Sequence, residues 1–591
     1  MDSIIQKQID ELIVELKKAG QNINDPVSKL MVTTLIYQTQ KIRDEIESIP
    51  SRVVDRLCSY FIPGNKVDAI PALCLVQIAL KQKKDIVPHS LANGTYFTYK
   101  LSAKQILSYY PLFENLIVPY TRLHVLTPRV LKTGASITQV MSGQKGQVWL
   151  GMEMDTEIET LTHVSFFIRG TNGLLPQKVY AGNGPVELAF ASAEQMERIA
   201  IIEPFDSQQA HHSFFEALSC WKQVLSSQND DGRLIYITDA LVDRDVFKGK
   251  AYPKSFQKSL ESSDLDTFGN NTLWILFDFG NQYEVPDTIE ILPNVVPVVN
   301  VGFNSVSLTQ SSPIAQLTKS DGAYFFHLIE TSSTSQKQGF SQIEDDVVIR
   351  DFNASCYNKD LLYRDVRNLY NRFIDDYYAF VDYHGLKDGE LIKSLRNIIN
   401  RIGKSVVSGG DSRNQFDEGV YAMRNVNQAQ LSSVVKVSYL TTWGRIGNAP
   451  KSGELMENKK DAAVEKEVSV ITSGMGGEDK PDADQRYELL RYYTLTSDRL
   501  YTKMDIDAFL RMQLLKEFGK DEVDRIKYSI QVQGAGGGPR LKRGLYIDIL
   551  FKDSKNYQKA ESMALDYNLR QKITEKSCIS MPIIVTLIDM G

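Results

Sequence analysis

The 591-residue sequence contains few cysteines, and they are not spaced as a zinc site or a disulfide framework requires. Three of the five lie in apolar runs, which is typical of reduced core residues: the set is Cys58, Cys74, Cys220, Cys356 and Cys578. No apolar run approaches the roughly 18 residues of a membrane span. The first residues alternate charged and apolar side chains, unlike a signal peptide. We therefore expect a cytoplasmic protein without direct membrane insertion.

A strong excess of one charge is also missing. Acidic residues number 73 and basic residues 67, which gives a formal net charge of −6. Such a balance does not indicate a nucleic-acid partner. The hydrophobic fraction of 42% is that of an ordinary globular protein. A chain of this length is expected to form roughly four domains.

Motifs that would indicate an enzyme are incomplete. The glycine run from Gly534 to Gly538 is followed by neither Lys-Ser nor Lys-Thr, and it precedes a predicted strand. A phosphate cradle needs a helix N-terminus there, so a hairpin loop is the better interpretation. The adjacent His211 and His212 would diverge on a helix and cannot chelate one ion. We expect no catalytic residue, no cofactor and no metal site.

Acidic clusters leave one enzymatic alternative open. A glycosidase uses two carboxylates, which Asp243 with Asp245, or Asp155 with Glu157 and Glu159, could supply. Strand alternation would place the last three on a solvated face. A hydrolase whose site is assembled only by folding is therefore kept as an alternative.

Hydrophobic periodicity predicts an α+β multidomain chain with N-terminal helices, β-rich middle domains and a C-terminal α+β domain. The last domain resembles half of a ferredoxin-like fold. The expected boundaries are an N-terminal helical segment at 1–65, a β-rich domain at 66–205, an α/β second domain at 206–330, a helical and strand region at 331–450, a flexible loop at 451–484 and the C-terminal domain at 485–591. The loop is expected because that segment is polar, contains glycine and has few large apolar residues.

Individual elements can also be predicted. The apolar run from Ala72 to Ile78 predicts a buried strand. Two prolines between Leu292 and Phe303 favour an edge or bulged strand over a central one. In the C-terminal domain we expect, in order, a helix (Ile506 to Phe518), two strands (Ile526 to Val532 and Leu545 to Phe551), a helix (Ser554 to Thr574) and a strand (Ile583 to Ile588).

An apolar stripe near the N-terminus is a candidate partner interface. Ile5, Ile9, Leu12 and Leu16 recur at spacings of four and three, which is typical of a coiled-coil-like seam. The same stripe would also suit a helix lying on the core of its own domain, and the sequence gives the two interpretations equal weight.

Tyrosines on a second predicted helix extend this candidate interface. The helix runs from Asp360 to Val381 and carries Tyr363, Tyr370 and Tyr377. Aromatic residues at helical spacing indicate a core or a subunit interface far more often than a ligand site.

Three stretches resemble the TssF family, the baseplate wedge proteins of type VI secretion systems. The first comprises Asp25-Pro26-Val27, a helix to Ile49-Pro50, the run from Tyr60 to Pro63 and a strand ending at Gln77, with an inserted spacer from Gly64 to Ala69. The second is Pro297-Val298-Val299-Asn300 leading to Phe303, with Gly302 inserted. The third runs from Arg543 to Ile549, before a helix and a final strand. Their shared order extends the resemblance over nearly the whole chain.

The resemblance implies a structural role in a contractile apparatus. In that family, two TssF copies and one TssG subunit form a wedge, and six wedges surround the spike hub. TssK-like trimers, a TssE-like subunit and the sheath are the further partners it implies. The alternatives are a wedge protein of a contractile phage tail or extracellular injection particle and, from another class, a soluble hydrolase with a β-sandwich binding domain.

Overall fold

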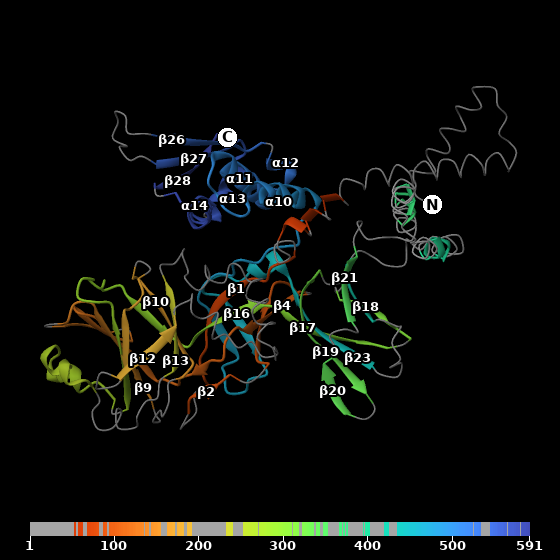
Figure 1. Cartoon of the computed structure of the whole chain (residues 1–591). Helices are drawn as coiled ribbons and strands as arrows, with labels where there is room; N and C mark the ends of the chain where they lie inside the picture. Colours follow the sequence, from red (N-terminus) through yellow and green to blue (C-terminus); the bar gives the residue numbers. More distant parts are fainter. Residues whose placement is uncertain are drawn as a thin grey trace, which may run out of the picture. The chain divides into compact units, whose positions relative to one another are not determined.

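The computed structural model describes residues 53–62, 68–191, 232–239, 252–352, 366–375, 394–401, 419–424 and 434–590, with short gaps inside these ranges. The chain divides into two compact units. Unit 1 comprises Met1–Val67, Arg350–Val420 and Pro481–Gly591, and unit 2 comprises Asp68–Ile349 and Tyr421–Lys480. The described chain is β-rich with a smaller helical part (Figure 1).

Unit 2 contains a closed antiparallel barrel. In order around the barrel, its strands are β1 (Leu73–Gln77), β16 (Val295–Asn300), β4 (Ile106–Pro111), β3 (Tyr96–Lys100), β24 (Leu455–Lys459) and β25 (Glu467–Val470). The barrel closes where β25 pairs with β1, through Val76↔Val470 and Gln77↔Ser469. Figure 1 shows β1, β16 and β4 lying together in unit 2.

The strand β1 is buried on both faces, which confirms the prediction for Ala72 to Ile78. Leu73 and Leu75 belong to one core cluster, whereas Cys74 and Val76 belong to another. Alternate side chains of a strand point to opposite faces, so β1 separates two cores. A strand of this kind reads as a continuous apolar run, which is why the sequence predicted it.

The prediction of an edge or bulged strand at 292–303 is wrong for β16. This strand pairs with β1 on one side and β4 on the other, and all its residues are buried. The ladder with β4 begins at Val298↔Pro111. Pro297 therefore lies at the end of that ladder, where its missing N–H interrupts no central hydrogen bond.

The prediction of a flexible loop at 451–484 is also wrong. This segment supplies β24 and β25, two strands of the closed barrel. Met456, Val468 and Val470 are buried in its core. Only every second residue of a barrel strand faces the interior, so a few apolar residues suffice, and average composition conceals them.

A second sheet of unit 2 curls around a core of its own. Its strand order is β15 (Glu290–Pro293), β10 (Val164–Arg169), β13 (Arg233–Asp239), β12 (Val186–Ala191), β11 (Lys178–Ala181), β14 (Thr272–Asp278), β9 (Gln147–Glu153), β6 (Arg122–Leu126), β7 (Val130–Thr133) and β8 (Ser136–Gln139). Phe166 of β10 meets Phe277 of β14 edge to face, with ring centroids 5.7 Å apart. Strands distant in the sheet thus share one core.

Smaller elements lie mainly in unit 2, and β21 and β22 cross its boundaries with unit 1. One sheet contains β17 (Gly302–Leu308), β23 (Val434–Thr442), β19 (Tyr324–Ser335) and β20 (Gln338–Gln342), and another contains β18 (Ile314–Gln316), β22 (Gly419–Arg424) and β21 (Val347–Phe352). The short strands β2 (His89–Ser90) and β5 (Leu116–Ile117) pair together. The short helices are η2 (Lys254–Lys258), α7 (Ser262–Leu265) and η4 (Gly444–Asn448).

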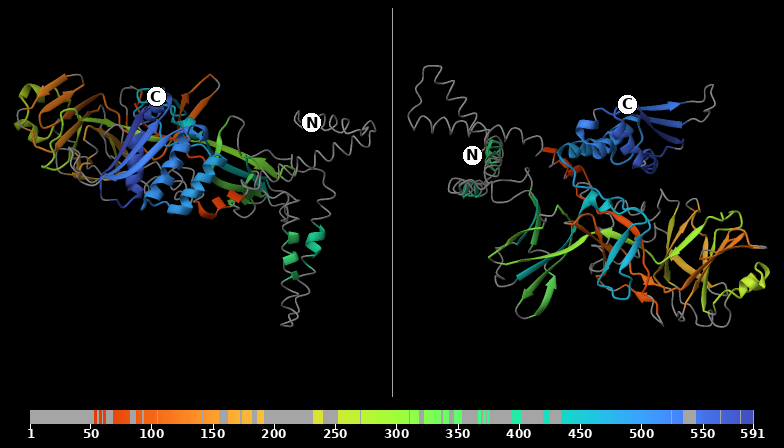
Figure 2. Two further views of the ribbon diagram at one scale, coloured as in Figure 1. Left: turned by 90° about the horizontal axis from the view of Figure 1, so that it is seen from above. Right: turned by 180° about the vertical axis from the view of Figure 1, so that it is seen from behind.

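Unit 1 contains a C-terminal three-stranded sheet with helices packed on one face (Figure 2). Its elements are α10 (Ala483–Thr496), α11 (Lys503–Phe518), α12 (Lys520–Val523), β26 (Lys527–Gln533), β27 (Gly544–Phe551), α13 (Ser554–Ser562), α14 (Leu565–Lys576) and β28 (Ile583–Asp589). β26 and β27 are antiparallel, whereas β27 and β28 are parallel.

The order of elements predicted for the C-terminal part is present, with three differences. The helix expected from Ser554 to Thr574 is divided into α13 and α14, and neither α10 nor the short α12 was predicted. Asp482 and Thr502 begin α10 and α11 with capping boxes, in which side chain and backbone satisfy each other's hydrogen bonds. The ferredoxin-like assignment stays a prediction.

Candidate partner interface

The residues predicted to contact partners lie mostly outside the described part of the chain. These are Ile5, Ile9, Leu12, Leu16, Tyr363 and Tyr377. Tyr370 is described, and it is helical and half-buried. The structure therefore leaves this interface as a prediction.

The residues considered for chemistry also lie outside the described residues. They are His211, His212, the glycine run 534–538 and the carboxylates Asp155, Glu157, Glu159, Asp243 and Asp245. Within the described ranges, no three His, Cys, Asp or Glu side chains come together as metal ligands would. No helix in these ranges is both long enough and apolar enough to span a membrane.

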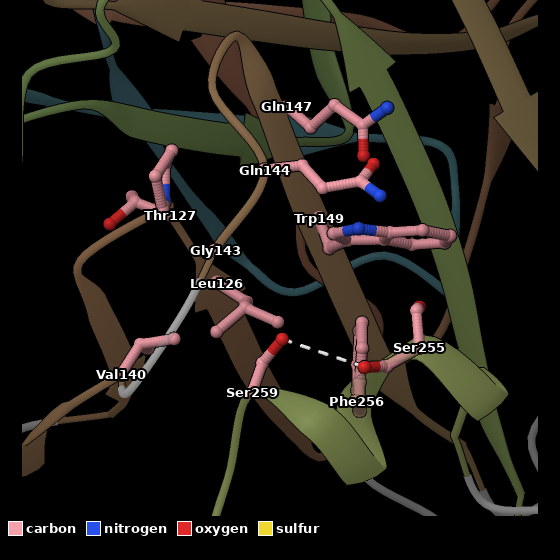
Figure 3. A pocket seen from close by; sticks show the side chains of 11 residues that line it. Leu126, Thr127, Val140, Gly143, Gln144, Gln147, Trp149, Ser255, Phe256 and Ser259 are labelled. Atoms are coloured by element: carbon pink, nitrogen blue, oxygen red, sulfur yellow. Dashed lines mark hydrogen bonds between the residues drawn. The ribbon is translucent and has the colours of Figure 1, made fainter.

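One pocket is a hollow at one end of the ten-stranded sheet (Figure 3). Its lining residues are all uncharged and include Leu126, Val140, Gln144, Trp149, Phe256 and Ser259. Trp149 meets the buried Phe256 edge to face, with ring centroids 5.3 Å apart. Its walls offer neither a general acid nor a general base, because no lining side chain titrates near neutral pH.

The fold brings together two of the stretches that carry the family resemblance. Gln77, at the end of the first stretch, pairs with Val295, and Leu73 pairs with Val299 of the second. These stretches are neighbouring strands of one barrel, although more than two hundred residues separate them. Parts of both stretches therefore form adjacent strands of the barrel wall.

Asn300, which ends the second stretch, is a fully buried hydrogen-bonding centre. Its amide nitrogen donates to the carbonyl oxygen of Ser108 over 3.0 Å. Its side-chain oxygen accepts from the backbone N–H of Trp443 over 3.3 Å. One side chain thus joins β16 to β4 and to the residue that follows β23, so a buried polar residue is satisfied by backbone groups.

Asn294 has a similar role where the chain passes from β15 to β16. Its backbone φ is +58°, in the left-handed region that asparagine tolerates better than most residues. The side-chain oxygen accepts from the N–H of Val118 over 2.9 Å, and the amide donates to the Val118 carbonyl over 2.8 Å. These two hydrogen bonds hold the connection between β15 of the curled sheet and β16 of the barrel in place.

His124 is a fully buried titratable group of the curled sheet. Its ring nitrogens lie 2.9 Å from Thr133 Oγ1 and 2.9 Å from Glu153 Oε1. Burial lowers the pKa of the imidazole, and the hydrogen bond and charge of Glu153 partly oppose this effect. Because the histidine side chain is wholly buried, the arrangement suits structural support and not substrate contact.

Exposed apolar side chains mark surfaces of unit 1 that the sequence did not identify. In the first of the three stretches that resemble TssF, Tyr60 is 82% exposed and Phe61 is 57% exposed, whereas Ile62 is buried in the core of unit 1. On β28, Ile584 and Ile588 are also exposed. The strand β28 was predicted from the sequence, but its uncovered face was not.

Comparisons with known proteins give structural neighbours only. No family model matches the sequence, and no curated protein matches it. One similar chain belongs to a solved structure of the type VI secretion system TssK-TssF-TssG baseplate subcomplex. That match has a TM-score of 0.43 and 10% identity, and covers 95% of this chain and 96% of the other. A second similar chain belongs to a structure described as the baseplate complex from the type VI secretion system, with a TM-score of 0.31, 11% identity and coverage of 99% and 96%.

Proposed function

We propose that this protein is a structural subunit of the baseplate wedge in a type VI secretion system, corresponding to TssF. The observation that carries the proposal is the pairing of β1 with β16, to which the backbone N–H of Asn300 adds a hydrogen bond with the carbonyl oxygen of Ala72. Two stretches chosen for their family resemblance thereby become adjacent parts of one framework. Chance similarity of unrelated short motifs would not be expected to select neighbouring strands.

The partners follow from the same proposal. Two copies of the chain would pair with one TssG-like subunit in a wedge, and wedges would surround the spike hub. TssK-like trimers, a TssE-like subunit and the sheath would bind this ring in the cytoplasm. The stripe of Ile5, Ile9, Leu12 and Leu16 and the tyrosines at 363, 370 and 377 are the proposed contact residues.

A mechanical role is also the better fit to the described pocket. The hollow beside Trp149 has an uncharged lining, whereas a glycosidase needs two carboxylates beside its substrate. The carboxylates considered for the hydrolase alternative lie outside the described ranges.

Co-expression of the full chain with its TssG-like neighbour tests the proposal. The expected product is a complex whose mass, measured by light scattering, corresponds to two copies of this chain and one TssG-like subunit. As a matched pair, Leu12→Lys should weaken the complex, whereas Lys17→Leu, outside the stripe, should leave it intact. A chain that binds neither the TssG-like nor the TssK-like subunit would contradict the proposal.

The phage-tail alternative is tested by the origin of the partners. Affinity purification of the tagged chain from its own cells should recover TssK-like and TssG-like subunits. Recovery of tail-tube and capsid proteins without a TssK-like subunit would favour the phage particle instead.

A further inference from the structure

The last strand, β28, forms one edge of the three-stranded sheet in unit 1. The strand order is β26-β27-β28, and β28 pairs with β27 in parallel register, from Leu545↔Ile583 to Phe551↔Asp589. Within the described part of the chain, no strand is paired with its other side. An edge strand presents backbone donors and acceptors to an incoming chain.

The hydrogen-bond phase shows which backbone groups face that edge. The N–H of Leu545 donates to the carbonyl oxygen of Pro582, and the N–H of Met590 donates to that of Phe551, both over 2.9 Å. Even-numbered residues of this strand therefore direct their backbone groups toward β27. Because direction alternates along a strand, those of Val585 and Leu587 point away from β27, toward the edge.

Most side chains of β28 are apolar. Val585 and Leu587 pack against the core beneath the helices. On the opposite face, Thr586 is exposed, and Ile584 and Ile588 are 38% and 36% exposed.

Each edge strand of the sheet has one charged residue, at one end. β28 contains no proline and has one charged residue, Asp589 at its end. At the other edge, β26 exposes Lys527, and a charged side chain of this kind discourages pairing between edge strands. β28 has no charged residue between Ile583 and Ile588, so nothing of this kind protects the middle of its edge.

We propose that β28 pairs antiparallel with β28 of a second copy of this chain, about a twofold axis through Thr586. The two three-stranded sheets then become one continuous sheet. Edge-facing backbone groups must meet each other, so Val585 exchanges hydrogen bonds with Leu587 of the second copy. In the same register Thr586 faces Thr586 of the second copy, and Ile584 faces Ile588.

The strand is self-complementary in this register, which is the reason to choose a second copy as its partner. A twofold interface requires one patch to match itself. Thr–Thr and paired β-branched side chains are favourable cross-strand neighbours, and they meet most closely at positions that are not hydrogen-bonded. Asp589 lies opposite Ile583 of the second copy, so the two carboxylates are at opposite ends and do not repel.

Charge substitutions test this register. Ile584→Lys combined with Ile588→Lys puts lysine opposite lysine and should weaken self-association of the full chain by about tenfold or more. Ile584→Glu combined with Ile588→Lys puts opposite charges together and should restore it. Val532→Lys on β26 is the control and should change nothing. Sedimentation at increasing concentration measures the association, and circular dichroism verifies folding.

A cysteine at the axis gives a second readout. In a Cys578→Ala background, Thr586→Cys should form a covalent dimer under mild oxidation, faster than Lys527→Cys on the other edge. The inference requires only this chain and no secretion partner, so its failure would leave the proposed function standing. It would be overturned by a monomer at all concentrations, by equal cross-linking at both edges, or by a dimer indifferent to the charge pairs.

Discussion

The backbone N–H of Asn300 donates to the carbonyl oxygen of Ala72 over 2.8 Å, which joins the end of β16 to the residue before β1. The Asn300 side chain adds bonds to Ser108 and Trp443, so four separated segments meet at one buried residue. This junction, together with closure of the barrel and burial of His124, gives four predictions.

Asn300→Ala should destabilise unit 2. The substitution leaves the partly buried carbonyl of Ser108 and the buried N–H of Trp443 without their partner, and a buried group left unsatisfied costs ~1–3 kcal/mol. The denaturant concentration at the midpoint of the unfolding transition, followed by tryptophan fluorescence, should therefore fall. Gln139→Ala, at an exposed position on β8, is the control and should leave it unchanged. Equal midpoints for both variants would contradict the role of Asn300.

Removal of Asn458 to Gly477 should prevent unit 2 from folding correctly. The deletion takes away β25 and the end of β24, and exposes the side of β1 that pairs with Val470. A true disordered insertion would tolerate the same deletion. Limited proteolysis should show rapid cleavage within 68–349 in the deleted chain, in contrast to the intact chain. An unchanged digestion pattern would mean that this segment is dispensable.

Pairing of β24 with β3 should be visible in the titration of Glu457. Hydrogen bonds from Lys100 and Lys459 lower the pKa of this carboxyl to about 2. Lys100 comes from β3, so the full shift requires the two strands to be paired. Lys100→Met should raise the Glu457 pKa, as measured by NMR of the labelled carboxyl. A pKa in the usual glutamate range in the unmodified chain would be inconsistent with this pairing.

His124 should make unit 2 sensitive to mild acid. Burial lowers its folded-state pKa below the ordinary value of 6.5, with Glu153 opposing the shift and Arg122 adding to it. The folded state therefore binds fewer protons, so this contribution to stability is complete above pH 6.5 and decreases as the pH falls toward the folded pKa. Thermal unfolding midpoints between pH 7 and pH 5 should decline more in the unmodified chain than in His124→Gln. Parallel declines would exclude His124 as the cause.

Several elements could be predicted because their pattern is local. The run from Ala72 to Ile78 is apolar at consecutive positions, which is sufficient to indicate a strand buried on both faces. The C-terminal order was predictable for a similar reason, since Leu545 to Phe551 and Ile583 to Ile588 are mainly apolar runs of strand length. The Pro-Val-Val-Asn stretch carried the family resemblance.

Tertiary structure decided what depends on distant partners. Residues 455–470 look polar in isolation, and they become strands because β1 and β3 offer hydrogen bonds and the barrel interior requires only alternate apolar residues. Pro297 favoured an edge strand in the sequence. In the structure the ladder with β4 begins one residue later, so β16 accommodates the proline although it is a central strand. Likewise, the sequence predicted a strand from Ile583 to Ile588, but the open face of β28 depends on which side the helices cover. Local propensity is encoded by neighbouring residues, whereas barrel closure, burial and free edges are set by contacts between residues far apart in the chain.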